Sequence, residues 1–166
     1  TSFTGEVLLK RSALSEMPCP VARTLDVVGH WWSLLIIRNA FYGHTRFKQF
    51  QENLGISRNI LAQRLQQLTD HGILEKTADR NGSKYPEYIL TDKGKDLMPV
   101  LVAFAGWGNK WAAPAGGPAL EMIDKRDGRP IPDQYIRGVD GGEVPLAALG
   151  TRPGPGAHRM QKKATS

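Results

Sequence analysis

The feature that most constrains this chain is a pair of short helical segments, separated by only three residues and followed by a hairpin signal. Residues 46–54 and 58–70 each repeat apolar side chains at helical spacing, and Gly55-Ile56-Ser57 lies between them. A glycine-containing turn of three or four residues between two short helices is the helix-turn-helix connection. Beyond Gly72 the apolar spacing becomes that of strands on both sides of Asn81-Gly82, a dipeptide typical of tight hairpins. The pattern predicts two short helices that lead directly into a small antiparallel sheet.

The segments on either side extend this pattern. Thr45, Ser57 and Thr91 are residue types that cap helix N-termini, and each precedes a segment with helical spacing. We expect helices over residues 20–28, 32–41, 46–54, 58–70 and 93–111, and strands over residues 73–78 and 85–91. The predicted fold class is mainly α with a small β-hairpin wing, a winged helix-turn-helix with a loop-rich C-terminal extension.

The C-terminal third of the chain differs from the rest in composition. Residues 113–157 hold 9 of the 18 glycines and 7 of the 11 prolines, with turn pairs at Asp127-Gly128 and Gly141-Gly142. We expect no internal repeat. The predicted organisation is an N-terminal segment over residues 1–17, a winged helix-turn-helix domain over 18–112, a Gly/Pro-rich, hairpin-like extension over 113–150 and a disordered tail over 151–166.

The helix expected over residues 58–70 has two contrasting faces. One face is apolar and consists of Leu61, Leu65 and Leu68. The opposite face is rich in amides and carries Asn59, Gln63 and Gln66. Amide side chains can make paired hydrogen bonds to adenine edges in the major groove of DNA. Ser57 and Arg58 lie at the N-terminal end of this helix, which is the end that usually enters the groove.

Basic residues flank this helix along the sequence. Residues 46–84 contain seven basic and four acidic residues, a net charge of +3. The candidates for contacts to the DNA backbone or the minor groove are Arg46, Lys48, Arg80, Asn81 and Lys84. We therefore interpret the segment as a reader of double-stranded DNA. The alternative is a winged helix that binds another protein, which should present an apolar or acidic face on the second helix.

The overall composition narrows the classes of function. A formal net charge of +6 and a pI near 9.6 favour polyanionic partners. The single cysteine excludes an internal disulfide and any zinc site made of cysteines alone. No run approaches the ~20 apolar residues of a membrane span, so we expect a cytoplasmic protein without a membrane partner. The sequence contains no catalytic triad pattern, His-Glu-x-x-His motif or nucleotide-binding glycine loop, and we predict no enzyme activity, metal or cofactor.

Several short motifs occur together in the order and spacing of one known family. They are Cys19-Pro20-Val21, Leu25-Asp26-Val27-Val28-Gly29, Trp32-Ser33-Leu34-Leu35-Ile36-Ile37, Arg46-Phe47, Gly72-Ile73-Leu74 and Tyr88-Ile89-Leu90-Thr91-Asp92-Lys93-Gly94. Over about residues 19–108 the chain resembles the HxlR family of winged-helix regulators, which is related to the MarR-like group. The resemblance implies a homodimer on an inverted-repeat operator, with the terminal helices forming the dimer interface. We expect the regulator to act as a repressor.

The resemblance also implies ways in which a signal is received. Cys19 matches a cysteine that senses electrophiles or oxidants in many HxlR-type proteins, and its position before Pro20 at a helix N-terminus favours the thiolate. The alternative is a small, buried hydrophobic residue. Four aromatic residues either line a pocket for a small-molecule effector or pack in the core and dimer interface: Trp32, Phe104, Trp107 and Trp111. Some relatives carry a hairpin similar to a zinc knuckle in the extension, which here lacks cysteines, and we expect a zinc-free remnant.

Overall fold

The structure is a computed structural model that describes residues 12–78, 82, 84–132 and 135–156. The chain divides into two compact units. The first runs to Thr91 and takes in the residues from Pro153 onward, and the second runs from Asp92 to Arg152. Within the described residues, no helix is both long enough and apolar enough to cross a membrane.

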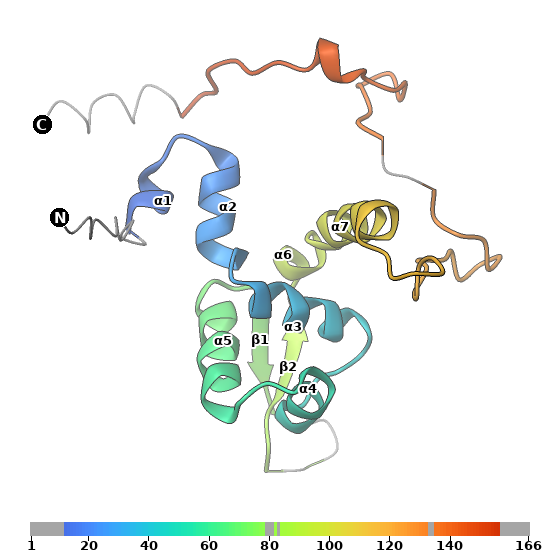
Figure 1. The fold of residues 1–166 in the computed structure, drawn as a ribbon. Coiled ribbons are helices and arrows are strands. Elements are labelled where there is room, and N and C mark those ends of the chain that lie inside the picture. Colours follow the sequence, from blue (N-terminus) through green and yellow to red (C-terminus); the bar gives the residue numbers. More distant parts are fainter. Residues whose placement is uncertain (1–11, 79–81, 83, 133–134, 157–166) are drawn as a thin grey trace, which may run out of the picture. The chain divides into compact units, whose positions relative to one another are not determined.

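The first unit contains the helices and the two strands that the sequence pattern predicts (Figure 1). Its elements are α1 (Ser12–Glu16), α2 (Pro20–Val28), α3 (Trp31–Phe41), α4 (Phe47–Leu54), α5 (Arg58–Asp70), β1 (Leu74–Thr77) and β2 (Glu87–Leu90). The bounds of α2 and α5 are those expected, because a proline begins α2 and Ser57 caps α5. The serine Oγ accepts a hydrogen bond from the backbone N–H of Ile60 at 3.4 Å. The short helix α1 was not predicted.

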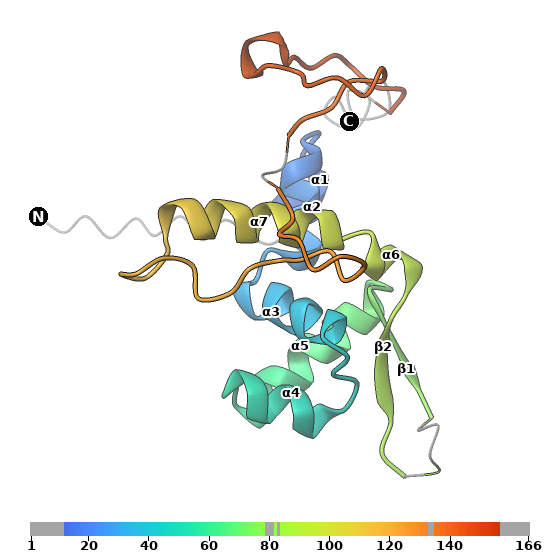
Figure 2. The ribbon, with the colours of Figure 1, turned by 90° about the vertical axis from the view of Figure 1, so that its right-hand side faces the viewer.

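The two strands pair antiparallel and form the wing (Figure 2). Their register places Leu74 opposite Leu90 and Thr77 opposite Glu87. The start of α4 joins this sheet, because Arg46 forms an isolated β-bridge with Glu87. The wing is therefore attached through backbone pairing to the first helix of the helix-turn-helix pair.

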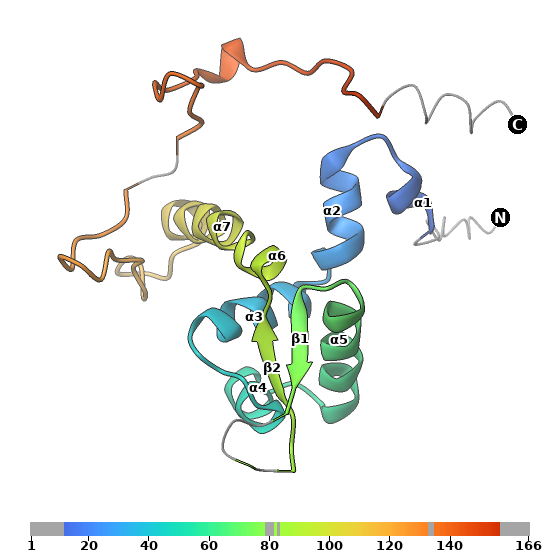
Figure 3. The same ribbon diagram turned by 180° about the vertical axis from the view of Figure 1, so that it is seen from behind.

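An apolar core lies between α3, α4, α5 and the wing (Figure 3). Its most completely buried apolar side chains are Ile36, Ile37, Phe50, Leu61, Leu65, Leu68 and Leu74. Full burial of one such side chain contributes about 1.5–3 kcal/mol to the free energy of folding. Because every element of the pair and the first strand of the wing contribute to this core, α5 is held in a fixed orientation within the first unit.

The predicted helix cap at Thr45 is wrong. The Thr45 hydroxyl donates to Glu87 Oε1 at 3.0 Å, and the start of α4 is instead capped by Gln49 Oε1, which accepts from the Thr45 N–H at 3.0 Å. The Thr91 hydroxyl donates to the carbonyl oxygen of Gly72 at 2.6 Å, and Thr91 directly precedes the helix that begins at Asp92. Both threonines tie the wing to a neighbouring helix or turn. At Thr45 this long-range contact takes the place of the predicted cap.

The second unit begins with two helices where the sequence analysis predicts one. They are α6 (Asp92–Lys95) and α7 (Met98–Trp111). Pro99 explains the interruption, because it has no N–H to donate to the preceding turn and its ring crowds that turn. The expectation of a continuous helix over residues 93–111 is therefore wrong.

The extension contains two short hairpins of similar sequence, contrary to the expectation of no internal repeat. Residues 123–132 and 136–145 share an isoleucine at the first position, Asp-Gly at the fifth and sixth, and a proline at the tenth. The turn glycine has a positive φ in both copies, 74° at Gly128 and 80° at Gly141. A backbone hydrogen bond of 2.7 Å closes each hairpin. A single 3-10 turn, η1 (Leu146–Ala148), follows the second copy.

Candidate nucleic-acid interface

Helix α5 presents its amide face to solvent. Leu61, Leu65 and Leu68 are at most 1% exposed, and they pack against α3, α4 and β1. The exposed side chains on the opposite face include Asn59, Gln63 and Gln66. The Gln66 side-chain amide donates to Asp70 Oδ1 at 2.7 Å, whereas no such bond engages Asn59 or Gln63. Within the first unit, α5 is therefore packed on one side and free on the side that could enter a major groove.

The N-terminal end of α5 is also built for an anionic partner. Gly55 ends α4 in the left-handed conformation, with φ 61°, which allows the sharp turn into α5. Ser57 caps the helix, and the exposed Arg58 places its guanidinium 5.9 Å from the centre of the Phe47 ring. Backbone N–H groups at a helix N-terminus attract phosphate groups.

A buried polar network fixes α4 against α3, and the sequence analysis missed it. Asn39 of α3 is completely buried, and its Nδ2 donates to Asn53 Oδ1 of α4 at 2.7 Å. Its own Oδ1 accepts from Arg38 Nη2 at 3.0 Å. The signal was available, because an asparagine inside an apolar helix must find partners when it is buried. The network helps to orient the helix that leads into the turn before α5.

Two basic candidates lie at the start of α4. Arg46 is partly exposed and occupies the bridge between α4 and β2. Lys48 is exposed and forms an ion pair of 3.5 Å with Glu52, one helical turn later. An exposed pair of this kind contributes little to stability and leaves the lysine able to exchange partners.

The wing supplies further positive charge. Lys84 is exposed, with its Nζ 5.4 Å from the ring centre of Tyr85. Lys76 of β1 is also exposed and lies 6.0 Å from the Tyr88 ring, but the sequence analysis did not select it. Arg80 and Asn81, which were selected, lie outside the described residues.

Cys19 occupies the N-cap position of α2. It is a free cysteine of intermediate exposure, and its side chain makes no capping hydrogen bond. Partial exposure gives a small oxidant or electrophile access to the sulfur. The alternative of a fully buried hydrophobic role does not fit this exposure.

The four selected aromatic residues belong to two different units. Trp32 lies in the first unit and stacks on Trp31, with 3.9 Å between ring centres. Phe104, Trp107 and Trp111 lie on α7 in the second unit and are 61%, 65% and 68% exposed. With Val100 they recur at intervals of four, three and four residues, which places them on one face of α7. These α7 residues form an apolar surface, and the pocket described below lies on the other side of the helix.

Among the described residues, no group of three or more His, Cys, Asp or Glu is arranged to hold a metal ion. In the first hairpin of the extension, Asp124 and Asp127 are instead paired with arginines.

Comparison with known proteins identifies a family and relatives of this chain. The model of the HxlR-like helix-turn-helix family matches residues 27–115. Rv3095, an uncharacterized HTH-type transcriptional regulator of Mycobacterium tuberculosis, is 34% identical over 136 residues, which are 82% of this chain and 86% of that protein.

Solved structures support the same assignment. The crystal structure of PA1607, a candidate transcription factor, is 39% identical with a TM-score of 0.80, and the match covers 84% of this chain and 98% of PA1607. The reduced form of the redox regulator HypR is 29% identical with a TM-score of 0.51, and the match covers 55% of this chain and 92% of HypR. The match to PA1607 leaves only 16% of this chain unmatched. Residues 113–152 make up more than that share, so the match includes part of this segment. The shared core is therefore the winged helix-turn-helix, and the extension is an addition found in some relatives.

Proposed function

This chain belongs to the HxlR-like helix-turn-helix family and is a transcriptional regulator of that type, and from this premise we propose that it binds a specific operator as a homodimer and represses transcription. The observation that carries the proposal is the two-sided character of α5. Its leucine face is buried in the core, whereas Asn59 and Gln63 are exposed and free to bond to base edges. A helix that served only as packing would not need an exposed amide face beside several cations.

The basic residues have a different role in this proposal. Arg46 and Lys48 contact the phosphate backbone beside the groove that α5 enters, and Ser57 and Arg58 bring the helix N-terminus to a phosphate. Lys84 contacts the minor groove or a flanking phosphate, as do the wing residues Arg80 and Asn81. Contacts to phosphates position the protein without selecting a sequence, so selection falls to Asn59, Gln63 and Gln66.

The homodimer in this proposal forms through α7. Phe104, Trp107 and Trp111 expose most of their surface on one face of this helix. A large exposed apolar patch on a soluble protein marks an interaction site. A second copy of the chain is the occupant that an inverted-repeat operator requires, because two recognition helices must lie about 34–36 Å apart, one turn of DNA.

Cys19 gives the regulator a redox input in this proposal. The likeness to HypR, a redox regulator, and the partial exposure of the thiol support it. Two Cys19 thiols, one from each subunit, form a disulfide when an oxidant such as diamide accepts their two electrons and two protons and is reduced to its hydrazine. Alternatively, the same oxidant accepts two electrons and two protons from one Cys19 thiol and one small-molecule thiol, which join in a mixed disulfide. Either change at the start of α2 alters the dimer and lowers its affinity for the operator.

Genomic footprinting followed by a purified system tests the proposal. The tagged protein is used to locate protected sites, and the strongest site is then cloned beside its promoter. We expect protection of two half-sites related by a two-fold axis, competition by unlabelled operator but not by shuffled DNA, and reduced transcription in vitro. Equal binding to operator and shuffled DNA, or no binding to either, would contradict the proposal and favour a winged helix that binds protein.

A further inference from the structure

Helix α7 has two unlike sides within the second unit. One side carries the exposed aromatic residues described above. The opposite side carries Val102, Gly106, Asn109 and Lys110, which lie against the first hairpin of the extension and the segment before it. The Asn109 side-chain amide donates to the carbonyl oxygen of Leu120 at 3.0 Å and joins the helix to this segment. The extension therefore covers one side of α7 and leaves the aromatic side open.

A pocket of about 400 Å³ lies between α7 and the extension. We call it the α7 pocket, and it is lined by Val102, Gly106, Asn109, Lys110, Pro118, Glu121, Met122, Pro130, Ile131 and Pro132. Its volume falls in the range of small-molecule sites, about 300–1,000 Å³. A Cβ atom added to Gly106 would meet no atom within 4 Å, so this glycine opens the helix side of the pocket.

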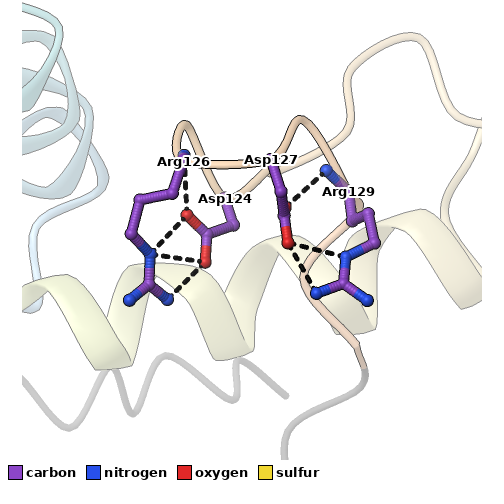
Figure 4. Close-up of polar contacts among 4 residues, drawn as sticks. All are labelled: Asp124, Arg126, Asp127 and Arg129. Atoms are coloured by element: carbon purple, nitrogen blue, oxygen red, sulfur yellow. Dashed lines mark hydrogen bonds and ion pairs between the residues drawn. The ribbon is translucent and has the colours of Figure 1, made fainter.

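The hairpin that forms the outer wall is held by local ion pairs (Figure 4). Arg126 Nε donates to Asp124 Oδ1 at 2.9 Å, and Arg129 Nε donates to Asp127 Oδ2 at 2.7 Å. Arg126 holds the pKa of Asp124 below its usual value, and Arg129 does the same for the pKa of Asp127. The Ile131 N–H donates to the Met122 carbonyl oxygen at 2.7 Å and closes the hairpin. The wall is therefore shaped before any ligand arrives, which reduces the ordering cost of binding.

The chemistry of the lining residues selects a class of ligand. Three proline rings, Val102, Met122 and Ile131 offer flat apolar surface suited to an aromatic ring. Lys110 and Glu121 both line the pocket, and neither forms an ion pair within the described residues. The Lys110 Nζ lies 5.3 Å from the centre of the Trp111 ring, an exposed contact that the long side chain can exchange for an anionic ligand. Asn109 Nδ2 already donates to the Leu120 carbonyl oxygen, so Lys110 is the charged donor and Glu121 the charged acceptor available to a ligand.

We infer that the α7 pocket is a binding site for an aromatic small molecule that carries an anionic acceptor for Lys110 and an N–H or O–H donor for Glu121. This inference goes beyond the proposed function. It rests on the proposed function in one respect only, namely that a ligand bound in the pocket would regulate operator binding. The walls come from α7 and from the extension, whereas the HypR match covers little more than half of the chain. In this inference the extension serves to form the ligand site, because it supplies the wall that faces α7.

A fluorescence titration of the full chain tests the inference without DNA. The probe is 1-anilinonaphthalene-8-sulfonate, an aromatic sulfonate with one N–H donor. We expect saturable binding to the wild type and a loss of at least about tenfold in affinity for Gly106→Leu, because the new side chain fills the pocket. Lys110→Gln should weaken binding by about fivefold to tenfold, because a charge-assisted hydrogen bond becomes a neutral one.

Two matched variants separate the pocket from other surfaces. Gly108→Leu adds the same bulk to the same helix, where a Cβ also meets no atom within 4 Å, but Gly108 does not line the pocket. Phe104→Ala removes part of the aromatic surface on the other side of α7. We expect both to bind the probe within about twofold of wild type. No saturable binding, equal losses for both leucine variants, or a loss confined to Phe104→Ala would each overturn the inference. Any of these results would leave the proposed function intact, because operator binding is measured separately and does not depend on the α7 pocket.

Discussion

Replacing the free amides of α5 by alanine should abolish the discrimination between operator and random DNA. Asn59 and Gln63 lie four residues apart, about 6 Å along the helix at 1.5 Å per residue. This distance is close to the rise of two base pairs, so each amide can meet a different base. Both side chains are exposed and both variants favour helix, so Asn59→Ala and Gln63→Ala should leave the thermal midpoint of unfolding nearly unchanged.

The expected magnitude follows from the number of base-edge hydrogen bonds that each variant removes. One paired hydrogen bond to a base edge is worth about 1–3 kcal/mol of discrimination. A homodimer on an inverted repeat makes each paired bond twice, so a single variant should lose about 2–6 kcal/mol on the operator, about 30-fold to more than 10,000-fold in affinity. Gln66→Ala should lose less, because the Gln66 amide already donates to Asp70 at 2.7 Å.

Fluorescence anisotropy on labelled duplexes at fixed salt measures this difference. Each variant is titrated against the footprinted operator and against a shuffled duplex of the same length. The reasoning requires a large loss on the operator and little change on the shuffled duplex, for Asn59→Ala and Gln63→Ala alike. A parallel loss on both duplexes, or no loss on either, would show that the α5 face does not bind base edges.

Further predictions concern charge, assembly, oxidation and acid. Lys84→Ala should reduce the slope of log affinity against log salt by about 0.9 for each phosphate that the lysine neutralises, whereas the exposed Lys125→Ala control should not change the slope. Trp107→Glu should convert a dimer to a monomer in light scattering at micromolar concentration, because a charge enters the exposed aromatic surface. Diamide should lower the operator affinity of the wild type and leave Cys19→Ser unchanged; equal responses would remove Cys19 as the sensor. Because the pKa of Asp127 is lowered in the folded hairpin, its pairing with Arg129 contributes stability above the unfolded pKa of 3.8 and loses it as the pH falls through the lowered value. The Ile131 amide resonance should therefore keep its folded shift at pH 4 and change only below that.

Local signals were sufficient to predict helices α2 to α5 of the first unit, although α1 was missed. A proline at the start of α2, the glycine turn at Gly55 and the Ser57 cap each act within one turn of the helix that they bound. The Thr45 cap was wrong because its hydroxyl group bonds to Glu87, 42 positions away, which no local pattern reveals. The break before α7 could have been predicted, since Pro99 is visible in the sequence.

The candidate site was only partly predictable, because some of its contacts join residues that are far apart in the sequence. The amide face of α5 follows from helical spacing, so Asn59 and Gln63 could be selected from the sequence alone. The network around Asn39 depends on α3 and α4 being side by side, which spacing within either helix does not specify. The α7 pocket was missed because its walls come from a helix and from a hairpin whose repeat shares only four of its ten positions.

The two sides of α7 lead to a separation of functions that experiment can examine. If the extension served to complete the dimer interface, it would cover the aromatic side of the helix, where Trp107 and Trp111 remain exposed. It instead packs on the opposite side, through the hydrogen bond from Asn109 to Leu120. The proposed dimer interface and the proposed ligand site therefore lie on different sides of α7. Trp107→Glu should then disrupt association while probe binding persists, and Gly106→Leu should block the probe while the dimer persists. A ligand held on one side of the dimer helix could in this way change the spacing of the recognition helices without dissociating the subunits.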